Sequence, residues 1–86
     1  MKNKAVLQNF LLISAVAKRI DELLKKNNLT QYKLSKLAGV AEPTISGIRR
    51  QRNKTVSLNV VYAIAEGFGM SLSEFFDAEY FNTVTE

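Results

Sequence analysis

Residues 29–54 read LTQYKLSKLAGVAEPTISGIRRQRNK, two short segments of helical periodicity that meet at a glycine and end in a basic run. The first segment starts at Thr30, whose hydroxyl suits an N-cap, with Leu29 and Leu34 at the two positions of a hydrophobic staple. Gly39 follows where a left-handed residue ends a helix without a Cβ penalty. The stretch therefore predicts two short helices joined by a sharp turn.

The second helix of this pair is expected from Ala41 to Arg50. Pro43 lies in its first turn, where a missing N–H removes no intrahelical hydrogen bond. Ile45 and Ile48 are expected to face the core. The remaining positions are expected to face outward: Glu42, Pro43, Thr44, Ser46 and Gly47.

Amphipathic segments flank this pair on both sides. A first helix is expected from Phe10 or Ser14 to Lys26, a fourth after the cap Ser57 as far as Gly69, and a fifth at the capping box Ser71-Leu72-Ser73-Glu74. The chain is therefore expected to be all-α, a compact bundle of five helices. The inner face is expected to hold Val16, Ile20, Leu23 and Leu24 in the first helix, Leu34, Leu37 and Ala38 in the second, and Leu58, Val61, Ile64, Ala65 and Phe68 in the fourth. The opposite face of the first helix is expected to face solvent with Lys18, Arg19, Asp21, Glu22 and Lys25.

Composition restricts the possible chemistry. At 86 residues the chain forms one core, and its 47% hydrophobic and 23% charged content is typical of a globular protein. The sequence has no Cys and no His, so thiolate chemistry and the commonest general base and metal ligand are missing. Its eight acidic residues form no pair typical of an acid/base or metal site. We expect no enzymatic activity, no metal and no cofactor.

Charge is distributed unevenly along the chain. Residues 1–54 contain all twelve Lys and Arg and three acidic residues, a net charge of +9, whereas residues 55–86 contain no basic residue and five acidic ones. Such asymmetry favours a surface that faces a polyanion and an opposite end kept away from it. A nucleic acid is the first candidate partner.

The N-terminal residues MKNKAVLQNFLLISAVA imitate a secretory signal, with a basic start and an apolar run. Gln8 and Asn9 interrupt the run, which is also too short to span a bilayer, and no disulfide-forming residue follows. We expect no membrane association and a cytoplasmic location.

The quoted stretch and its flanks resemble the phage-repressor and Cro-like helix-turn-helix family, the XRE-type transcriptional regulators. The resemblance covers residues 16–76 and runs through Leu29-Thr30-Gln31, Ala38-Gly39-Val40, Thr44-Ile45-Ser46, Ser57-Leu58, Ile64-Ala65, Phe68-Gly69 and residues 71–76. It implies a lambda-repressor-like bundle whose second and third helices form the helix-turn-helix. It also implies binding to double-stranded DNA, with the third helix in the major groove and a homodimer on a two-fold operator.

The resemblance also implies roles for single residues. Gln31 matches a position that touches phosphate and braces the reading helix, Thr44 one that contacts the DNA backbone, and Glu42, Pro43 and Gly47 positions that face bases. Glu42, Pro43 and Gly47 differ from the Gln, Arg, Asn or Lys that family members usually have at these positions. Ala41 likewise replaces the Ser or Thr that usually caps the reading helix. Glu42 is able to accept from a cytosine amino group. Direct readout would then be limited, with DNA shape or guanine contacts from Arg49 and Arg50 contributing.

Basic residues behind the reading helix complete the expected site. Arg49, Arg50, Arg52 and Lys54 are expected to neutralise phosphates, and Tyr32 beside Gln31 is a candidate phosphate donor. Each has a plainer alternative: a solvated basic loop, an exposed tyrosine, and, for Gly47, a glycine merely tolerated in a helix. Ser46 is included in the expected DNA-binding site only because its position on the second helix of the pair is expected to face outward.

The segments outside the match are expected to serve assembly. We divide the chain into an N-terminal extension at 1–13 that is able to continue into the first helix, a DNA-binding domain at 14–76, and an acidic tail at 77–86. The end segments contain the apolar residues Val6, Leu7, Phe10, Leu11, Tyr80, Phe81 and Val84. These residues either cover the core or form a dimer interface, and we favour the dimer interface. Our hypothesis is a bacterial or phage DNA-binding regulator, with repression the favoured direction. The rival is a protein-interaction module, such as an antitoxin or antirepressor-like component, in which DNA binding is secondary.

Overall fold

The computed structural model describes residues 3–53 and 55–82, with the side chains of residues 3–10 left out of the description. These residues form helices and connecting turns, with no strand among them, so the all-α expectation is confirmed. The helices are α1 (Asn3–Lys26), α2 (Gln31–Ala38), α3 (Glu42–Arg49), α4 (Leu58–Gly67), α5 (Leu72–Phe75) and α6 (Glu79–Asn82).

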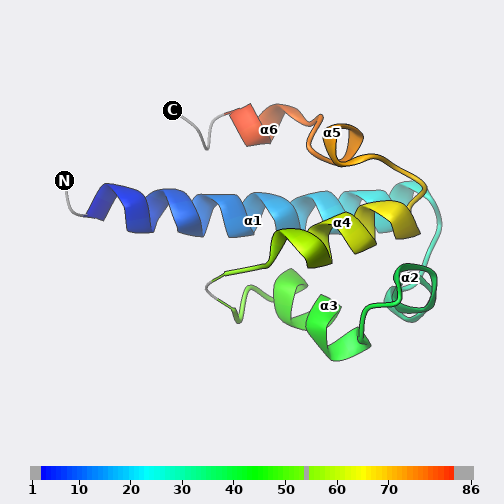
Figure 1. Ribbon diagram of the computed structural model, residues 1–86. Helices are drawn as coiled ribbons and strands as arrows, with labels where there is room; N and C mark the ends of the chain where they lie inside the picture. The colour runs from blue at the N-terminus through cyan, green and yellow to red at the C-terminus, as the bar shows by residue number, and fades with distance from the viewer. Residues whose placement is uncertain (1–2, 54, 83–86) are drawn as a thin grey trace.

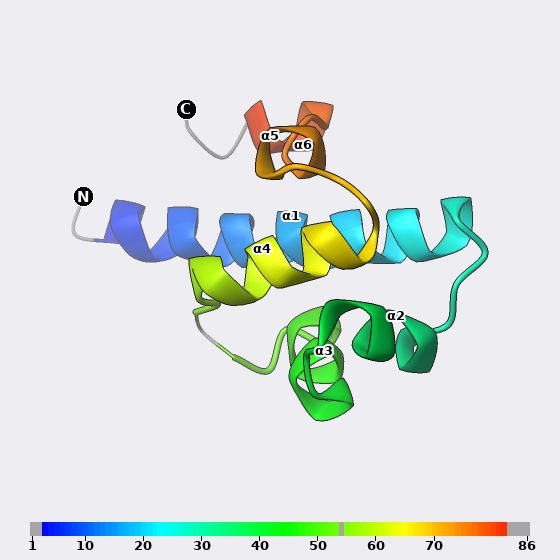
Figure 2. The same cartoon turned by 45° about the vertical axis from the view of Figure 1, so that its right-hand side comes forward.

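The long helix α1 is the axis around which the other helices pack. In Figures 1 and 2, α2 and α3 lie on one side of α1, α5 and α6 lie on the opposite side, and α4 runs beside it. The chain extends 41 Å along its longest axis and 24 and 20 Å along the others. Helix α3 packs against α1, and α2 packs against both α3 and α4, so the predicted helix pair is supported from two directions.

One apolar core joins all six helices. Ile20, Leu34, Ile45, Ile64 and Phe75 are each fully inaccessible to solvent. The first four of these residues confirm the inner faces expected at those positions of the first four helices. Burying one such side chain stabilises the fold by about 1.5–3 kcal/mol relative to leaving it exposed. The same core therefore fixes the orientation of α3 through Ile45 and Ile48.

Four consecutive helices end in the same way. Asn28, Gly39, Gln51 and Gly69 each follow a helix with a positive φ, at 54°, 67°, 56° and 74°. After each of them the next backbone N–H returns to a carbonyl in the last helical turn, as in Val40 to Ser35 at 3.2 Å and Arg52 to Gly47 at 2.9 Å. This geometry satisfies carbonyls that would otherwise lack an intrahelical partner. The turn predicted at Gly39 is confirmed, as are the ends predicted for the first helix at Lys26 and for the fourth helix by Gly69.

Three helix starts also follow the sequence. The hydroxyls of Thr30, Ser57 and Ser71 accept from the backbone N–H groups of Lys33, Val60 and Glu74. The Glu74 carboxylate accepts in return from the Ser71 N–H at 2.8 Å, which completes the capping box and lowers the pKa of Glu74. Each predicted cap is present because capping depends only on residues within one turn of each other.

The first helix, α1, begins at Asn3 and not at Phe10 or Ser14, so the N-terminal extension continues into it from that residue. No proline or glycine occurs in its first half, so nothing in that stretch interrupts the hydrogen-bonded turns. In Figure 1 this part of α1 extends beyond the rest of the bundle. No helix in the described ranges is both long enough and apolar enough to cross a bilayer.

Several side chains lie where sequence periodicity did not place them. Leu37 and Leu58 are 51% and 64% exposed, although both were expected on inner faces. Leu58 is the first residue of α4, where the helix has not yet reached the core, and the α2 face that meets α4 centres on Leu34 and Ala38. Arg19 was expected in solvent, but its side chain is only 12% exposed and binds α5.

The C-terminal segment adds a sixth helix, α6, that the sequence did not predict. Phe81 is only 8% exposed, and its ring packs edge-on against Phe76 at 5.0 Å between centroids. The Tyr80 hydroxyl donates to Glu22 of α1 at 2.9 Å, and the Lys18 ammonium lies 4.6 Å from the Tyr80 ring centre. These aromatic residues therefore cover the core of their own chain. The side chains of Val6, Leu7, Phe10 and Val84 lie outside the described residues.

Candidate nucleic-acid interface

The turn between α2 and α3 sets the direction of α3. Gly39 adopts the left-handed conformation, and the backbone N–H groups of Gly39 and Val40 both donate to the Ser35 carbonyl. Helix α3 then begins without a side-chain cap, because Ala41 has no oxygen to offer. Glu42 and Pro43 occupy its first turn, as expected. The absent cap makes this end of α3 weaker by about 0.5–2 kcal/mol than a Ser or Thr would.

Ile45 and Ile48 hold one face of α3 in the core, at 0% and 2% exposure. On another face, Pro43 is exposed, and Glu42, Thr44 and Ser46 are partly exposed. Gln31, Glu42, Pro43 and Ser46 line one open hollow on the surface, where the start of α2 meets the start of α3. The structure thus brings together four of the residues that the sequence proposed for DNA contact.

A chain of polar contacts connects this hollow with α1. The Nε atom of Arg49 donates to Asp21 Oδ1 at 2.6 Å, and its Nη1 atom donates to Gln31 Oε1 at 2.9 Å. The Gln31 Nε2 atom donates in turn to Glu42 Oε2 at 3.1 Å. We name this set, Asp21, Arg49, Gln31 and Glu42, the Asp21–Glu42 relay. Sequence reasoning missed Asp21 because its partner lies 28 residues away.

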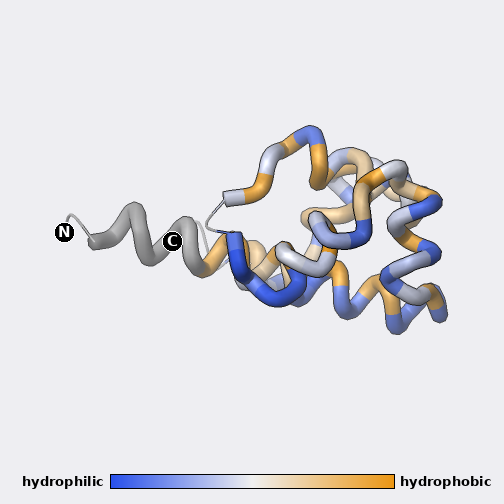
Figure 3. The backbone as a smooth tube through the Cα atoms, turned by 90° about the horizontal axis from the view of Figure 1, so that it is seen from below, coloured by the Kyte–Doolittle hydropathy of each residue, from blue (hydrophilic) through white to orange (hydrophobic). Residues whose placement is uncertain are grey.

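Arg49, the last residue of α3, therefore differs from the basic residues that follow it. Its side chain is 32% exposed and is shared between α1 and α2. Arg50 and Arg52 are both exposed to solvent. Seen from the α2–α3 side, the end of α3 and the loop that follows form a strongly hydrophilic stretch (Figure 3). Lys54, proposed for the same role, lies outside the described residues.

Gly47 is buried, contrary to the expectation that it faces outward. A Cβ atom built on it would lie 3.1 Å from the Nδ2 atom of Asn53, so the loop after α3 folds back over this position. The Arg52 N–H, which donates to the Gly47 carbonyl at 2.9 Å, holds the loop there. The loop, rather than a ligand, occupies the space beside Gly47.

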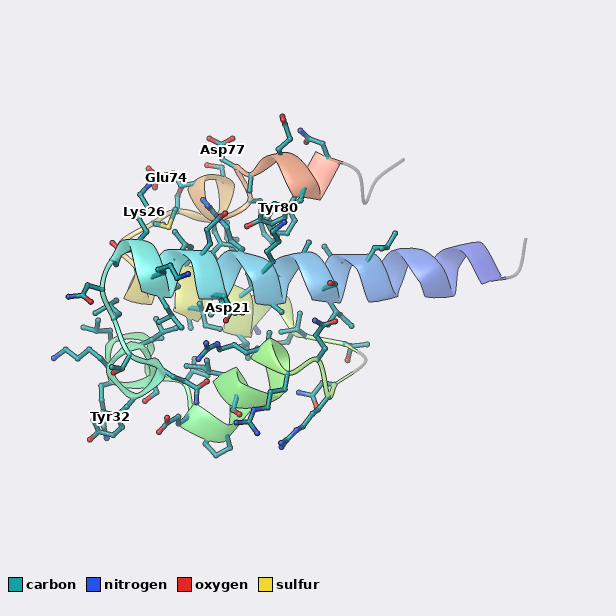
Figure 4. The ribbon with its side chains drawn as sticks, turned by 180° about the vertical axis from the view of Figure 1, so that it is seen from behind. Asp21, Lys26, Tyr32, Glu74, Asp77 and Tyr80 are labelled. Atoms are coloured by element: carbon teal, nitrogen blue, oxygen red, sulfur yellow. The ribbon has the colours of Figure 1, made fainter. Side chains whose placement is uncertain are left out.

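Tyr32 is 58% exposed on α2, as its candidate role requires (Figure 4). The ammonium of Lys36, a residue that the sequence analysis did not single out, lies 5.1 Å from its ring centre. Tyr32, Lys36 and Glu42 line a second open hollow at the turn between the two helices. Among the described residues, no cluster of three or more acidic side chains suited to a metal ion is found.

The geometry is that of two helices at a fixed turn, the second of which offers a polar face beside a basic loop. Residues 19–79 match the Cro/C1-type HTH DNA-binding domain. The chain belongs to this family. The match confirms the resemblance drawn from residues 16–76 and makes DNA binding the activity of this Cro/C1-type domain. Comparison with curated proteins found no match.

Proposed function

We propose that this Cro/C1-type domain binds double-stranded DNA sequence-specifically, with α3 in the major groove. In this proposal the protein is a cytoplasmic repressor of transcription. The observation that carries the proposal is the arrangement of α3. Its isoleucines are buried, while Glu42, Pro43 and Ser46 line an open surface beside exposed arginines. An α-helix held in this way fits the width of a major groove.

Contacts to the DNA backbone come, in this proposal, from Gln31, Tyr32, Thr44, Arg50, Arg52 and Lys54. Gln31 has a second Nε2 hydrogen besides the one given to Glu42, and this hydrogen is able to donate to a phosphate. Arg50 and Arg52 supply positive charge, which sets affinity and register but not sequence preference. Gly47 is buried and is therefore not among the proposed contacts.

Base recognition is assigned to Glu42, Pro43 and Ser46. A carboxylate accepts hydrogen bonds only, and in the major groove the cytosine amino group is its matching donor. Glu42 uses one of its oxygen atoms for Gln31, and the other carboxylate oxygen is left for a base. We therefore propose a preference for cytosine opposite Glu42, with Pro43 in apolar contact and Ser46 as an additional polar contact.

We further propose that the domain acts as a homodimer on half-sites about 34 Å apart. Leu11 and Leu12, in the first half of α1, are 40% and 39% exposed. Pairing of this segment between two chains would cover both residues. The double variant Leu11→Lys/Leu12→Lys should therefore weaken binding to a two-fold operator while leaving affinity for a single half-site within about twofold, since the α3 surface is unchanged.

A salt titration of binding to duplex DNA tests the main proposal. We expect affinity to fall steeply with salt, and Arg52→Ala to flatten the slope of log affinity against log salt by about one unit. Lys18→Ala is the matched control, because it removes one positive charge from the face of α1 that meets α6. Equal slopes for the parent protein and Arg52→Ala, or no duplex binding at all, would favour the protein-interaction module.

A further inference from the structure

Beyond the bases and phosphates themselves, the Asp21–Glu42 relay gives α1 a part in sequence recognition. We propose that Asp21, acting through Arg49 and Gln31, is a positioning residue that fixes the Glu42 carboxylate for a cytosine amino group. This inference rests on the proposed function. It assigns to a residue outside the helix-turn-helix a share in the choice of base.

The two partners of the Gln31 amide fix its direction. Its oxygen accepts from the Arg49 guanidinium at 2.9 Å, and its nitrogen donates to the Glu42 carboxylate at 3.1 Å. Rotating the amide by half a turn would place its nitrogen against a guanidinium, which has donors only, and its oxygen against a carboxylate, which has acceptors only. Arg49 and Glu42 therefore select one orientation of the amide, and in that orientation Gln31 holds Glu42.

Asp21 holds the guanidinium of Arg49 in place. Its Nε atom lies 2.6 Å from Asp21 Oδ1, which leaves Nη1 aimed at Gln31. The guanidinium is planar and rigid, so fixing Nε also fixes the direction of Nη1. Without the Asp21 carboxylate the arginine would gain rotamers, and Gln31 would lose the partner that orients it. Arg49 and Asp21 thus act on Glu42 from a distance, with no contact to DNA.

Holding the Glu42 side chain reduces the conformational entropy that it loses on binding a base. An unrestrained glutamate loses side-chain freedom when it binds a base, and one already held by Gln31 loses less. Glu42 and Arg49 are seven residues apart on α3, two turns along one face, so the relay secures both ends of the helix to α1 and α2. A defined position of Glu42 favours the one base whose amino group meets it.

The charges of the relay argue against the simplest alternative, that Arg49 binds a DNA phosphate. Arg49 is surrounded by the Asp21 carboxylate and the Gln31 oxygen, so its positive charge is partly used inside the protein. A phosphate would have to compete with a carboxylate already in place at 2.6 Å. Among the described residues, no carboxylate forms an ion pair with the exposed Arg50 or Arg52, so these two side chains are better placed to bind phosphate.

The test starts from bound sequences selected from a random pool of duplexes by the parent protein. Glu42→Gln identifies the base position that Glu42 reads, as the position at which the preference for cytosine is lost. At that position, Asp21→Asn should lower the preference for cytosine by about threefold to tenfold, within the range of discrimination that one base contact provides. The longer carboxylate of Asp21→Glu should restore part of it.

Two further variants separate positioning from charge. Asp77→Asn makes the same change of charge and shape in the turn between α5 and α6, and Figure 4 shows Asp77 on the opposite side of α1 from Asp21. It should leave the preference unchanged. Arg49→Lys keeps the positive charge but not the planar fork, so it should lose the preference as Asp21→Asn does, with an unchanged salt slope.

The opposite results would overturn the inference. If Asp21→Asn kept the cytosine preference and steepened the salt slope by about one unit, Arg49 would be a phosphate ligand restrained by Asp21. If the parent protein bound duplexes but Glu42→Gln changed no base preference, the relay would have nothing to position. If the parent protein bound no duplex, the proposed function itself would fail, and this inference would fail with it.

Discussion

Arg19 of α1 donates from Nε to the Phe75 carbonyl oxygen at 2.6 Å and from Nη2 to the Glu74 carbonyl oxygen at 2.8 Å, across more than fifty positions of sequence. Both carbonyls belong to the last turn of α5, beyond which the helix does not continue, and the Glu74 carbonyl also accepts from the Asp77 backbone N–H at 3.2 Å. Arg19 therefore caps α5 with a positive charge. A helix of only four residues has little stability of its own, so this contact is a main reason for its position.

Arg19→Ala should lower the free energy of unfolding by roughly 2 kcal/mol, because it leaves two carbonyls without their charged donor. Chemical denaturation by urea, followed by circular dichroism, measures the change. Arg19→Lys should lose less, since an ammonium is still able to reach one carbonyl. A loss below about 0.5 kcal/mol for Arg19→Ala would show that water replaces the guanidinium at the end of α5.

Stability should decrease at alkaline pH through Tyr80. Burial, and then the hydrogen bond to Glu22, raise the pKa of Tyr80 from 10.0 to about 12. A raised pKa means that folding favours the neutral phenol, so this stabilisation is complete below pH 10.0 and is lost as the pH rises through about 12. Tyr80→Phe should remove this part of the alkaline decrease in the free energy of unfolding.

The measurement is made in a Tyr62→Phe background, because the hydrogen bond from Tyr62 to Glu66 also raises the pKa of Tyr62. Urea titrations at several pH values between 10.0 and about 12 give the slope for each variant. Equal slopes with and without the Tyr80 hydroxyl would contradict the assignment.

Gly67 allows the close approach of α2 and α4. A Cβ atom there would lie 3.0 Å from the Ala38 Cβ atom and 3.1 Å from both the Ala38 nitrogen and Leu34 Cδ1. Gly67→Ala should therefore destabilise the domain by about 1–2 kcal/mol, although alanine is the better helix former by about 1 kcal/mol. Thermal unfolding measures the difference. An increase in stability would mean that α2 shifts away without loss.

The features that the sequence predicts correctly are those decided within one helical turn. The caps at Thr30, Ser57 and Ser71 and the turn at Gly39 depend on neighbours three to five residues away. Periodicity likewise identifies the core face of α3, because Ile45 and Ile48 are three residues apart on one helix. The resemblance of residues 16–76, which the family match confirms, rests on these same local features.

The features that it misses are decided between helices. Asp21 and Arg19 belong to the polar face of α1 by periodicity, and only the packed bundle shows that they meet α3 and α5. Gly47 is buried by a loop that returns over it, which no helical period describes. The outward position of Leu58 likewise depends on how far the start of α4 extends from the core.

Gln51 occupies a conformation that suits glycine better. Its φ of 56° places it in the left-handed region after α3, where a side chain costs about 1 kcal/mol. Gln51→Gly should stabilise the domain by about 0.5 kcal/mol, since the freedom that glycine gains in the unfolded chain offsets part of the relief. Gly39→Ala is the reverse experiment, and nothing lies within 4 Å of the added Cβ there, so its destabilisation reports backbone conformation alone.

Gly47→Ala distinguishes a glycine needed for DNA from one that the loop merely covers. The added Cβ would lie 3.1 Å from Asn53 Nδ2, the far end of a side chain that is able to move, and alanine is favoured over glycine inside a helix by about 1 kcal/mol. The variant should therefore be as stable as the parent protein or more stable, by up to about 1 kcal/mol. Its duplex affinity should change by less than about twofold, because Gly47 is buried and the proposed contacts at Glu42, Pro43 and Ser46 are unchanged. Both quantities are measured on the same preparation, by urea denaturation and by fluorescence anisotropy with a labelled operator. Unchanged stability together with a tenfold loss of affinity would mean that the loop moves aside on binding and that DNA approaches Gly47 after all.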